Sequence, residues 1–252
     1  MRPLVLLALL LMNTPALAEE DPLGSPLWPE IREQVLGDGP LVFDDRVQVT
    51  APANAEDVTQ LPIAARVRGL EGVEALVVFA DFNPIPRILT LRPLVAEPYV
   101  ATRIKINMAT PVRAAARTSD GVWHVGGTWV DAAGGGCSQP SVASTSPDWQ
   151  DRLGEIHARA WPRDGGLNRL RIRLLHPMDT GLAGNIPAFF LERATILGEG
   201  DRPLAELDIA EPVAENPTFS LEVYSPAPLR FRGRDNSGND FVARITAGGP
   251  AP

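Results

Sequence analysis

The sequence predicts an all-β protein of two immunoglobulin-like sandwiches, preceded by one short helix and joined by a glycine-rich arm. The first observation is that apolar residues alternate with polar ones in many short segments. The second is that 25 prolines and 22 glycines separate these segments, as in chains of short strands and turns. The third is that the alternation stops over residues 132–150. This break divides the strands into two sets, each of the number expected for one sandwich.

The first 18 residues are predicted to be a secretory signal peptide. Arg2 supplies a positive charge, residues 4–12 are apolar, and Ala16-Leu17-Ala18 offers small residues for cleavage. This apolar run is shorter than the roughly 20 residues that a membrane-spanning helix needs. We therefore expect an exported protein, periplasmic in a Gram-negative cell, without membrane contact after cleavage.

A short helix and the first sandwich are predicted over residues 27–131. Ser25 and Pro26 have the residue types of an N-cap and a first helical position, and Gly37 ends the helix. The apolar positions of this helix recur every four residues, at Leu27, Ile31 and Val35. Alternation of period two then predicts strands near residues 47–49, 61–67, 73–80, 87–91, 100–106, 112–116 and 122–130.

A second sandwich is predicted over residues 151–246. Its strands are expected near residues 156–160, 169–174, 186–197, 204–209, 219–223, 229–231 and 241–245. Arginines alternate with apolar residues in one of them, at Arg169, Arg171 and Arg173. They form its outer face, which is either solvated or contacts an acidic partner or an anionic cargo. Three tryptophans are expected to pack in the core or between the domains: Trp123, Trp129 and Trp161.

Several classes of function are disfavoured by the residues. The net charge is −8, and no basic face of the kind that binds nucleic acid is evident. His124, His157 and His176 lack the spacing of metal ligands, and no phosphate-binding or dinucleotide-binding motif is present. We therefore expect no metal and no cofactor. Asp179-Thr180-Gly181 matches the aspartic-protease triplet, but that chemistry needs two carboxylates, and a turn explains the single copy better.

Cys137 is the only cysteine, so no intramolecular disulfide can form. It follows Gly134, Gly135 and Gly136, which we expect to make the arm flexible and to expose the thiol. An exposed thiol keeps a pKa near about 8.5 and is mostly protonated at neutral pH. Cys137 then serves better as an attachment point that partner enzymes act on than as a catalytic nucleophile. Burial as a small apolar residue and a homodimer linked through Cys137 remain alternatives.

The chain resembles the SoxYZ sulfur-carrier proteins, with a SoxY-like and a SoxZ-like part fused. Asp-Phe-Asn-Pro-Ile-Pro at residues 81–86 and Gly135-Gly136-Cys137 resemble SoxY, whereas His-Pro-Met-Asp-Thr-Gly at residues 176–181 resembles SoxZ. The resemblance implies two immunoglobulin-like domains and a cysteine that carries sulfur intermediates during sulfur oxidation. Ser138-Gln139 stands where the family has two further glycines, and the fused arrangement is similar to carriers associated with quinoprotein dehydrogenases.

The resulting hypothesis is a periplasmic carrier without enzymatic activity of its own. Cys137 would be the covalent attachment site, and Gly134, Gly135 and Gly136 would make the arm flexible. The expected partners are periplasmic oxidoreductases or sulfur-processing enzymes that bind transiently. The alternative is a non-catalytic accessory protein of a periplasmic quinoprotein (PQQ) dehydrogenase system.

Overall fold

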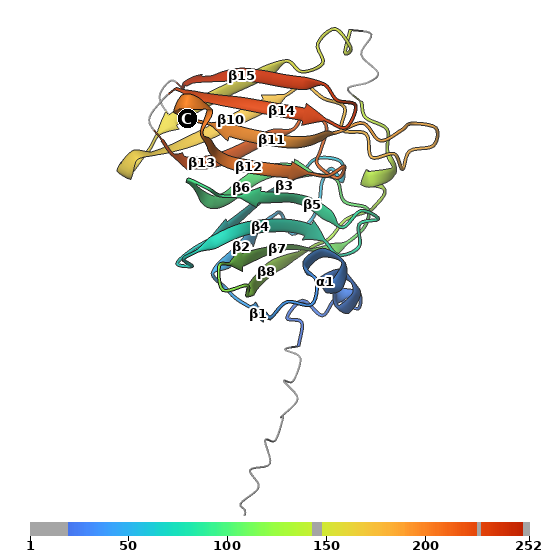
Figure 1. Cartoon of the computed structure of the whole chain (residues 1–252). Coiled ribbons are helices and arrows are strands. Elements are labelled where there is room, and N and C mark those ends of the chain that lie inside the picture. The colour runs from blue at the N-terminus through green and yellow to red at the C-terminus, as the bar shows by residue number, and fades with distance from the viewer. Residues whose placement is uncertain (1–19, 143–147, 226–227, 249–252) are drawn as a thin grey trace, which may run out of the picture.

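The computed structural model describes residues 20–142, 148–225 and 228–248 of the chain. The predicted signal peptide lies outside these residues. Within the described ranges, no helix is long and apolar enough to span a membrane. The fold is all-β with one short α-helix near the N-terminus, which confirms the predicted class (Figure 1).

The helix and the strands of the first half lie close to the predicted segments. They are α1 (Trp28–Leu36), β1 (Leu41–Phe43), β2 (Val47–Thr50), β3 (Leu61–Val67), β4 (Val73–Ala80), β5 (Arg87–Arg92), β6 (Ala96–Ile104), β7 (Thr110–Thr118) and β8 (Trp123–Val130). The second half contains β9 (Ile156–Pro162), β10 (Leu167–Leu174), β11 (Leu191–Leu197), β12 (Pro203–Ile209), β13 (Thr218–Tyr224), β14 (Leu229–Asp235) and β15 (Asp240–Ala247).

The two halves share both layers of the sandwich. In one layer β5 pairs with β12, from Leu89 opposite Ile209 to Arg92 opposite Glu206. In the other layer β6 pairs with β13, with Ala101 opposite Ser220. The strand order is β1-β8-β7-β4-β5-β12-β11-β14-β15-β9-β10-β13-β6-β3-β2, so hydrogen bonding continues across the boundary between the halves (Figure 1).

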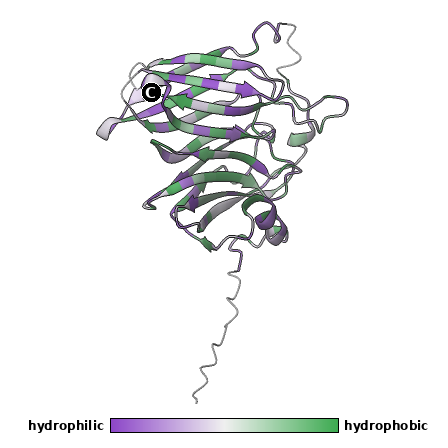
Figure 2. Cartoon of the chain, in the orientation of Figure 1, coloured by the Kyte–Doolittle hydropathy of each residue, from purple (hydrophilic) through white to green (hydrophobic). Residues whose placement is uncertain are grey.

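The main hydrophobic core is likewise continuous. Leu89 and Val100 of the first half belong to the same buried cluster as Leu207 and Leu221 of the second half. Apolar residues line the strands on both sides of the boundary (Figure 2). A second, smaller cluster packs α1 against the outer side of the first half and includes Trp28, Ile31, Val35, Phe79 and Trp123.

The helix begins later than predicted. Ser25 is not its N-cap, because α1 starts at Trp28 with Leu27 before it. The Ser25 carbonyl accepts a hydrogen bond from the Trp28 amide at 3.2 Å, and its own amide donates to the Asp21 carboxylate at 2.8 Å. Ser25 therefore belongs to the turn that leads into the helix.

The predicted strand 186–197 is also too long, because β11 begins only at Leu191. Asn185 has a positive φ of 64°, which bends the backbone away from strand geometry. Pro187 cannot donate a backbone hydrogen bond. The apolar residues before Leu191 consequently pack without forming a regular strand.

A buried arginine fastens the N-terminal segment to the first half. Arg113, on β7, is 1% exposed. Its Nε donates to Asp81 Oδ1 at 3.0 Å, and its Nη1 and Nη2 donate to Asp21 at 2.8 and 2.7 Å. Its guanidinium carbon lies 4.3 Å from the Trp28 ring centre. We call this arrangement, made of Arg113, Asp21, Asp81 and Trp28, the Arg113 clamp.

Candidate functional site

Cys137 lies between the two halves, in a short 3₁₀ turn over Gly136–Ser138. We call residues 134–142 the cysteine segment. The Gly135 amide donates to the Asn107 carbonyl at 2.8 Å, and the Gly136 amide donates to the Ile106 carbonyl at 3.0 Å. Cys137 is 1% exposed. The expectation of an exposed thiol on a flexible arm is therefore wrong for the cysteine segment, because main-chain hydrogen bonds hold it against the first half.

The glycines before Cys137 permit close packing in this structure. Gly134 and Gly135 have φ values of 104° and 89°, a region that residues with a side chain rarely adopt. A Cβ atom on Gly136 would lie 2.2 Å from the Val58 carbonyl oxygen and 2.5 Å from that of Ile106. These glycines therefore have a steric role in this structure, beside the flexibility predicted for them. A glycine run is compatible with both roles, since each depends on the missing side chain.

The second half holds the cysteine segment from the other side. The Thr180 hydroxyl donates to the Cys137 carbonyl oxygen at 2.6 Å. The Ser141 amide donates to Asp179 Oδ1 at 2.9 Å, and the Val142 amide donates to Glu215 Oε2 at 2.7 Å. Asp179 and Thr180 are buried, so their side chains bind the backbone of the cysteine segment in this structure.

The only lysine of the chain lies beside the thiol. Lys105 is 2% exposed, and its Nζ donates a hydrogen bond to the Met178 carbonyl oxygen. The Cys137 thiol points to the Lys105 carbonyl oxygen, with Sγ and O 3.7 Å apart. Burial lowers the pKa of Lys105, against the opposing charges of Asp179, Cys137 and Glu215. We call Lys105, Cys137, Met178, Asp179 and Thr180 the Lys105 junction.

Burial also sets the protonation state of Cys137. It raises the pKa of the thiol to about 11, and the nearby charge of Lys105 only partly opposes it. The expected pKa near the ordinary value is therefore wrong for this conformation. A protonated and covered thiol is neither a nucleophile nor a metal ligand. The arrangement can store the sulfur in an unreactive form, and chemistry at Cys137 requires the segment to open.

His176 is buried next to the Lys105 junction, at the packing position that the sequence predicts. It is 1% exposed, and its ring centre lies 4.5 Å from that of Phe189. Nε2 is 3.5 Å from Asp235 Oδ2, which is too long for a good hydrogen bond. Burial lowers the pKa of His176 to about 4, although the Asp235 carboxylate acts to raise it. The imidazole is therefore neutral at physiological pH.

The residues that cover the thiol were not identified from the sequence as site residues. Lys105 stands between Ile104 and Ile106 at the end of an alternating segment, and a charge among apolar neighbours is a signal of burial with partners. Asp179 and Thr180 belong to the most specific stretch of the family resemblance. Neither signal says which distant segment these side chains contact.

Comparison with known proteins gives a partial match that reaches this site. The family described as sulfur oxidation protein SoxY matches residues 32–137. None of the curated proteins matches the chain. Among solved structures, the sulfur carrier protein SoxY from Chlorobium limicola f thiosulfatophilum is 17% identical, with a TM-score of 0.38, and the match covers 42% of this chain and 96% of that one. The first half of the chain, ending at Cys137 itself, is thus similar to the SoxY family.

Proposed function

We propose that the chain is a sulfur carrier of the SoxY type, whose Cys137 thiol is the attachment point for a sulfur-containing group. The observation that carries this proposal is that the SoxY family match spans residues 32–137 and ends at the only cysteine of the chain. In this proposal the protein is exported to the periplasm, the second half is a fused SoxZ-like partner, and periplasmic oxidoreductases or sulfur-processing enzymes load and unload the thiol.

The carrier role requires the cysteine segment to leave its site. Hydrogen bonds hold it to the second half, including those from the Thr180 hydroxyl and from the Ser141 and Val142 amides. A neutral hydrogen bond contributes about 1 kcal/mol net, and one to a charged group about 1.5–3 kcal/mol. Opening therefore costs several kcal/mol, an amount that a docking partner can supply through its preference for the open form.

Opening would also activate the thiol. Because burial is the main cause of the raised pKa of Cys137, exposure returns the thiol toward its ordinary value of about 8.5. The closed form then protects an unloaded carrier from adventitious oxidation or alkylation. A partner that opens the segment would expose and activate the sulfur in one step.

Alkylation of the folded protein tests the opening step. The rate with iodoacetamide, followed by intact mass, is expected to be far below that of the urea-unfolded chain. Thr180→Val removes the bond to the Cys137 carbonyl, worth about 1 kcal/mol, and should accelerate alkylation about fivefold. Thr50→Val, on the exposed end of β2, is the matched control and should leave the rate unchanged.

Intact-mass analysis of protein purified from the periplasm without reductant tests the cargo. Adducts of sulfur-containing mass that are absent from Cys137→Ala would support the carrier. Wild-type protein without any adduct, even when its partner enzymes are co-expressed, would count against it.

The second candidate is a non-catalytic accessory protein of a periplasmic quinoprotein (PQQ) dehydrogenase system. The observation that favours it is the near-complete burial of Cys137 together with its pKa of about 11, since an interaction protein needs no accessible thiol. A Cys137→Ala strain separates the two candidates. Full activity of the pathway in this strain would favour the accessory role, whereas loss of activity with normal protein abundance would favour the carrier.

A further inference from the structure

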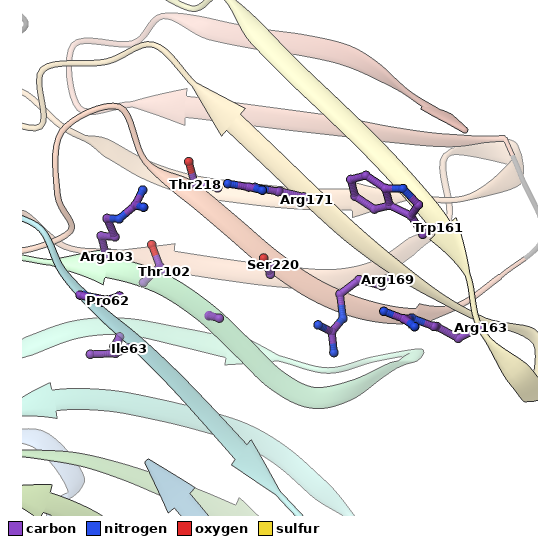
Figure 3. Close-up of a pocket in the computed structure, with 11 residues that line it drawn as sticks. Pro62, Ile63, Thr102, Arg103, Trp161, Arg163, Arg169, Arg171, Thr218 and Ser220 are labelled. Atoms are coloured by element: carbon purple, nitrogen blue, oxygen red, sulfur yellow. The ribbon is translucent and has the colours of Figure 1, made fainter. Parts of the chain in front are cut away.

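A concave site lies on the outer face of the layer formed by β9, β10, β13, β6 and β3, and Cys137 is not among its lining residues. Its volume is about 430 Å³, and the lining residues include Arg103, Arg163, Arg169, Arg171, Trp161 and Ser220. Figure 3 shows these side chains over neighbouring strands. We call it the arginine groove. Its volume falls within the roughly 300–1,000 Å³ typical of small-molecule sites.

Strand register explains why this face is hollow. Arg171 of β10 lies opposite Ser220 of β13, and Ser220 lies opposite Ala101 of β6. Ala101 in turn lies opposite Ala64 of β3. Two small lining residues, Ser220 and Ala101, therefore lie side by side on the floor, with Arg171 at one end of the row. Because these positions belong to paired strands, the floor is rigid and exists before any ligand binds.

The groove carries unpaired positive charge on an acidic protein. Within the described residues, the guanidinium groups of Arg103, Arg163 and Arg171 have neither an ion-pair nor a hydrogen-bond partner. Arg169 differs, because its Nε donates to Glu222 Oε1 at 2.9 Å. Among the residues that the structure describes, none of those that line the groove is acidic, although the chain has a net charge of −8. Like charges gathered in one concavity favour an anion strongly.

An apolar surface lies beside these charges. Trp161, on β9, is opposite Arg169 and is half-buried, with Gly248 packed against its indole nitrogen. Trp161 is therefore not a core residue. Pro62 and Ala101 add further apolar lining. An indole ring beside forked guanidinium donors suits a ligand with a flat apolar part and carboxylate-like groups.

We propose that the arginine groove binds a small organic anion that carries at least two acidic groups on an apolar, planar frame. Arg103 and Arg171 contact the acidic groups from β6 and β10, and Trp161 packs against the frame. This site is independent of Cys137, so it stands whether or not the carrier proposal holds. A guanidinium that pairs with a carboxylate contributes about 1.5–3 kcal/mol, so the loss of one should weaken binding roughly 10- to 100-fold.

Titration calorimetry on the full mature chain tests the site, with benzene-1,2,4-tricarboxylate as the probe. Binding is expected at low salt, with at least tenfold weaker affinity in Arg171→Gln and in Arg103→Gln. Arg117→Gln is the matched control, because Arg117 is an exposed arginine on β7 and is not among the residues that line the groove. Trp161→Leu should weaken binding of this probe more than binding of citrate, which has no ring. Thermal melting should show that these surface variants remain folded.

Three results would overturn the proposal. The first is the absence of binding heat up to millimolar probe in wild-type protein. The second is an equal loss of affinity in the Arg117→Gln control. The third is a preference for another class of ligand. Inorganic sulfate that binds as tightly as the organic probe would contradict the proposal, and so would a glutamate decapeptide that binds although the small anions show no binding.

Discussion

The Arg113 clamp and the Lys105 junction each bury one cation, but they supply it with different partners. Two carboxylates surround Arg113, and burial, which acts to lower its pKa, is outweighed by the hydrogen bonds to Asp21 and Asp81, so that the pKa rises. Lys105 donates to one carbonyl oxygen, and burial lowers its pKa. We infer that the Arg113 clamp fastens the N-terminal segment firmly, whereas the contacts of the Lys105 junction are easier to release.

The largest expected effect is the loss of the clamp. Arg113→Met leaves Asp21 and Asp81 without their cation, and breaking a buried ion pair from one side costs about 3–5 kcal/mol. Urea unfolding should show a loss of this size. Arg117→Met is the control, because Arg117 is an exposed arginine on the same strand. It should change the free energy of unfolding by no more than about 0.5 kcal/mol. Equal losses in the two variants would show that the clamp contributes no special stability.

Acid should weaken the region around the junction through His176. Its folded pKa of about 4 lies below the ordinary histidine value of 6.5, so the unfolded chain binds a proton in this pH range whereas the folded imidazole stays neutral. This contribution to stability is fully present above pH 6.5 and is lost as pH falls toward 4, by about 3 kcal/mol. His176→Gln should flatten the pH dependence of unfolding in this window. His157→Gln, at an exposed position, should leave the slope unchanged.

A methyl group at Gly136 should dislodge the cysteine segment. Gly136→Ala places a Cβ against the carbonyl oxygens of Val58 and Ile106, and such crowding costs about 1–3 kcal/mol. The expected result is a lower melting temperature and faster alkylation of Cys137. Gly135→Asn is the control, because nothing lies within 4 Å of its Cβ position and asparagine tolerates a positive φ. Similar alkylation rates in the two variants would contradict the steric role.

The smallest expected effect is at Lys105 itself. Lys105→Met replaces a poorly partnered buried ammonium with an apolar chain of similar length. It removes the cost of burying the charge, which offsets the loss of the donor to the Met178 carbonyl oxygen. We expect the free energy of unfolding to shift by less than about 1.5 kcal/mol. The pKa of Cys137 should rise further, because the charge of Lys105 acts to lower it. The pH dependence of alkylation in the Thr180→Val background would report this shift. A loss as large as that of Arg113→Met would remove the contrast between the two regions.

The sequence predicted the strands well because alternation records which face of a strand is buried. Leu170, Ile172 and Leu174 are buried, and the arginines between them face outward, as their period of two requires. Alternation cannot say which strands pair across the two halves, so the continuity of both layers was not predicted. The predicted end of an element was wrong where a single residue determines it. Asn185, with its positive φ, is an example, because β11 begins only after it, at Leu191.

The candidate site was predicted only in its location along the chain. Cys137 was identified from its glycines, but the sequence does not show that Gly136 packs against Val58 or that Thr180 binds the Cys137 carbonyl. Both contacts join residues far apart in the chain, and small polar residues are compatible with a free loop as well as with a packed one. Burial of the thiol depends on these partners and not on the composition of the segment.

The pairing of β5 with β12 and of β6 with β13 makes the two halves mutually dependent. If either half were produced alone, it would expose two unpaired strand edges and the apolar residues that pack against the other half. Both features promote aggregation. Conversely, proteolytic cleavage of the connection between β8 and β9 should leave both fragments together in one particle. The covalent link between the halves would then ensure that they are made in equal numbers. The strand pairing across the boundary would be enough to hold them together.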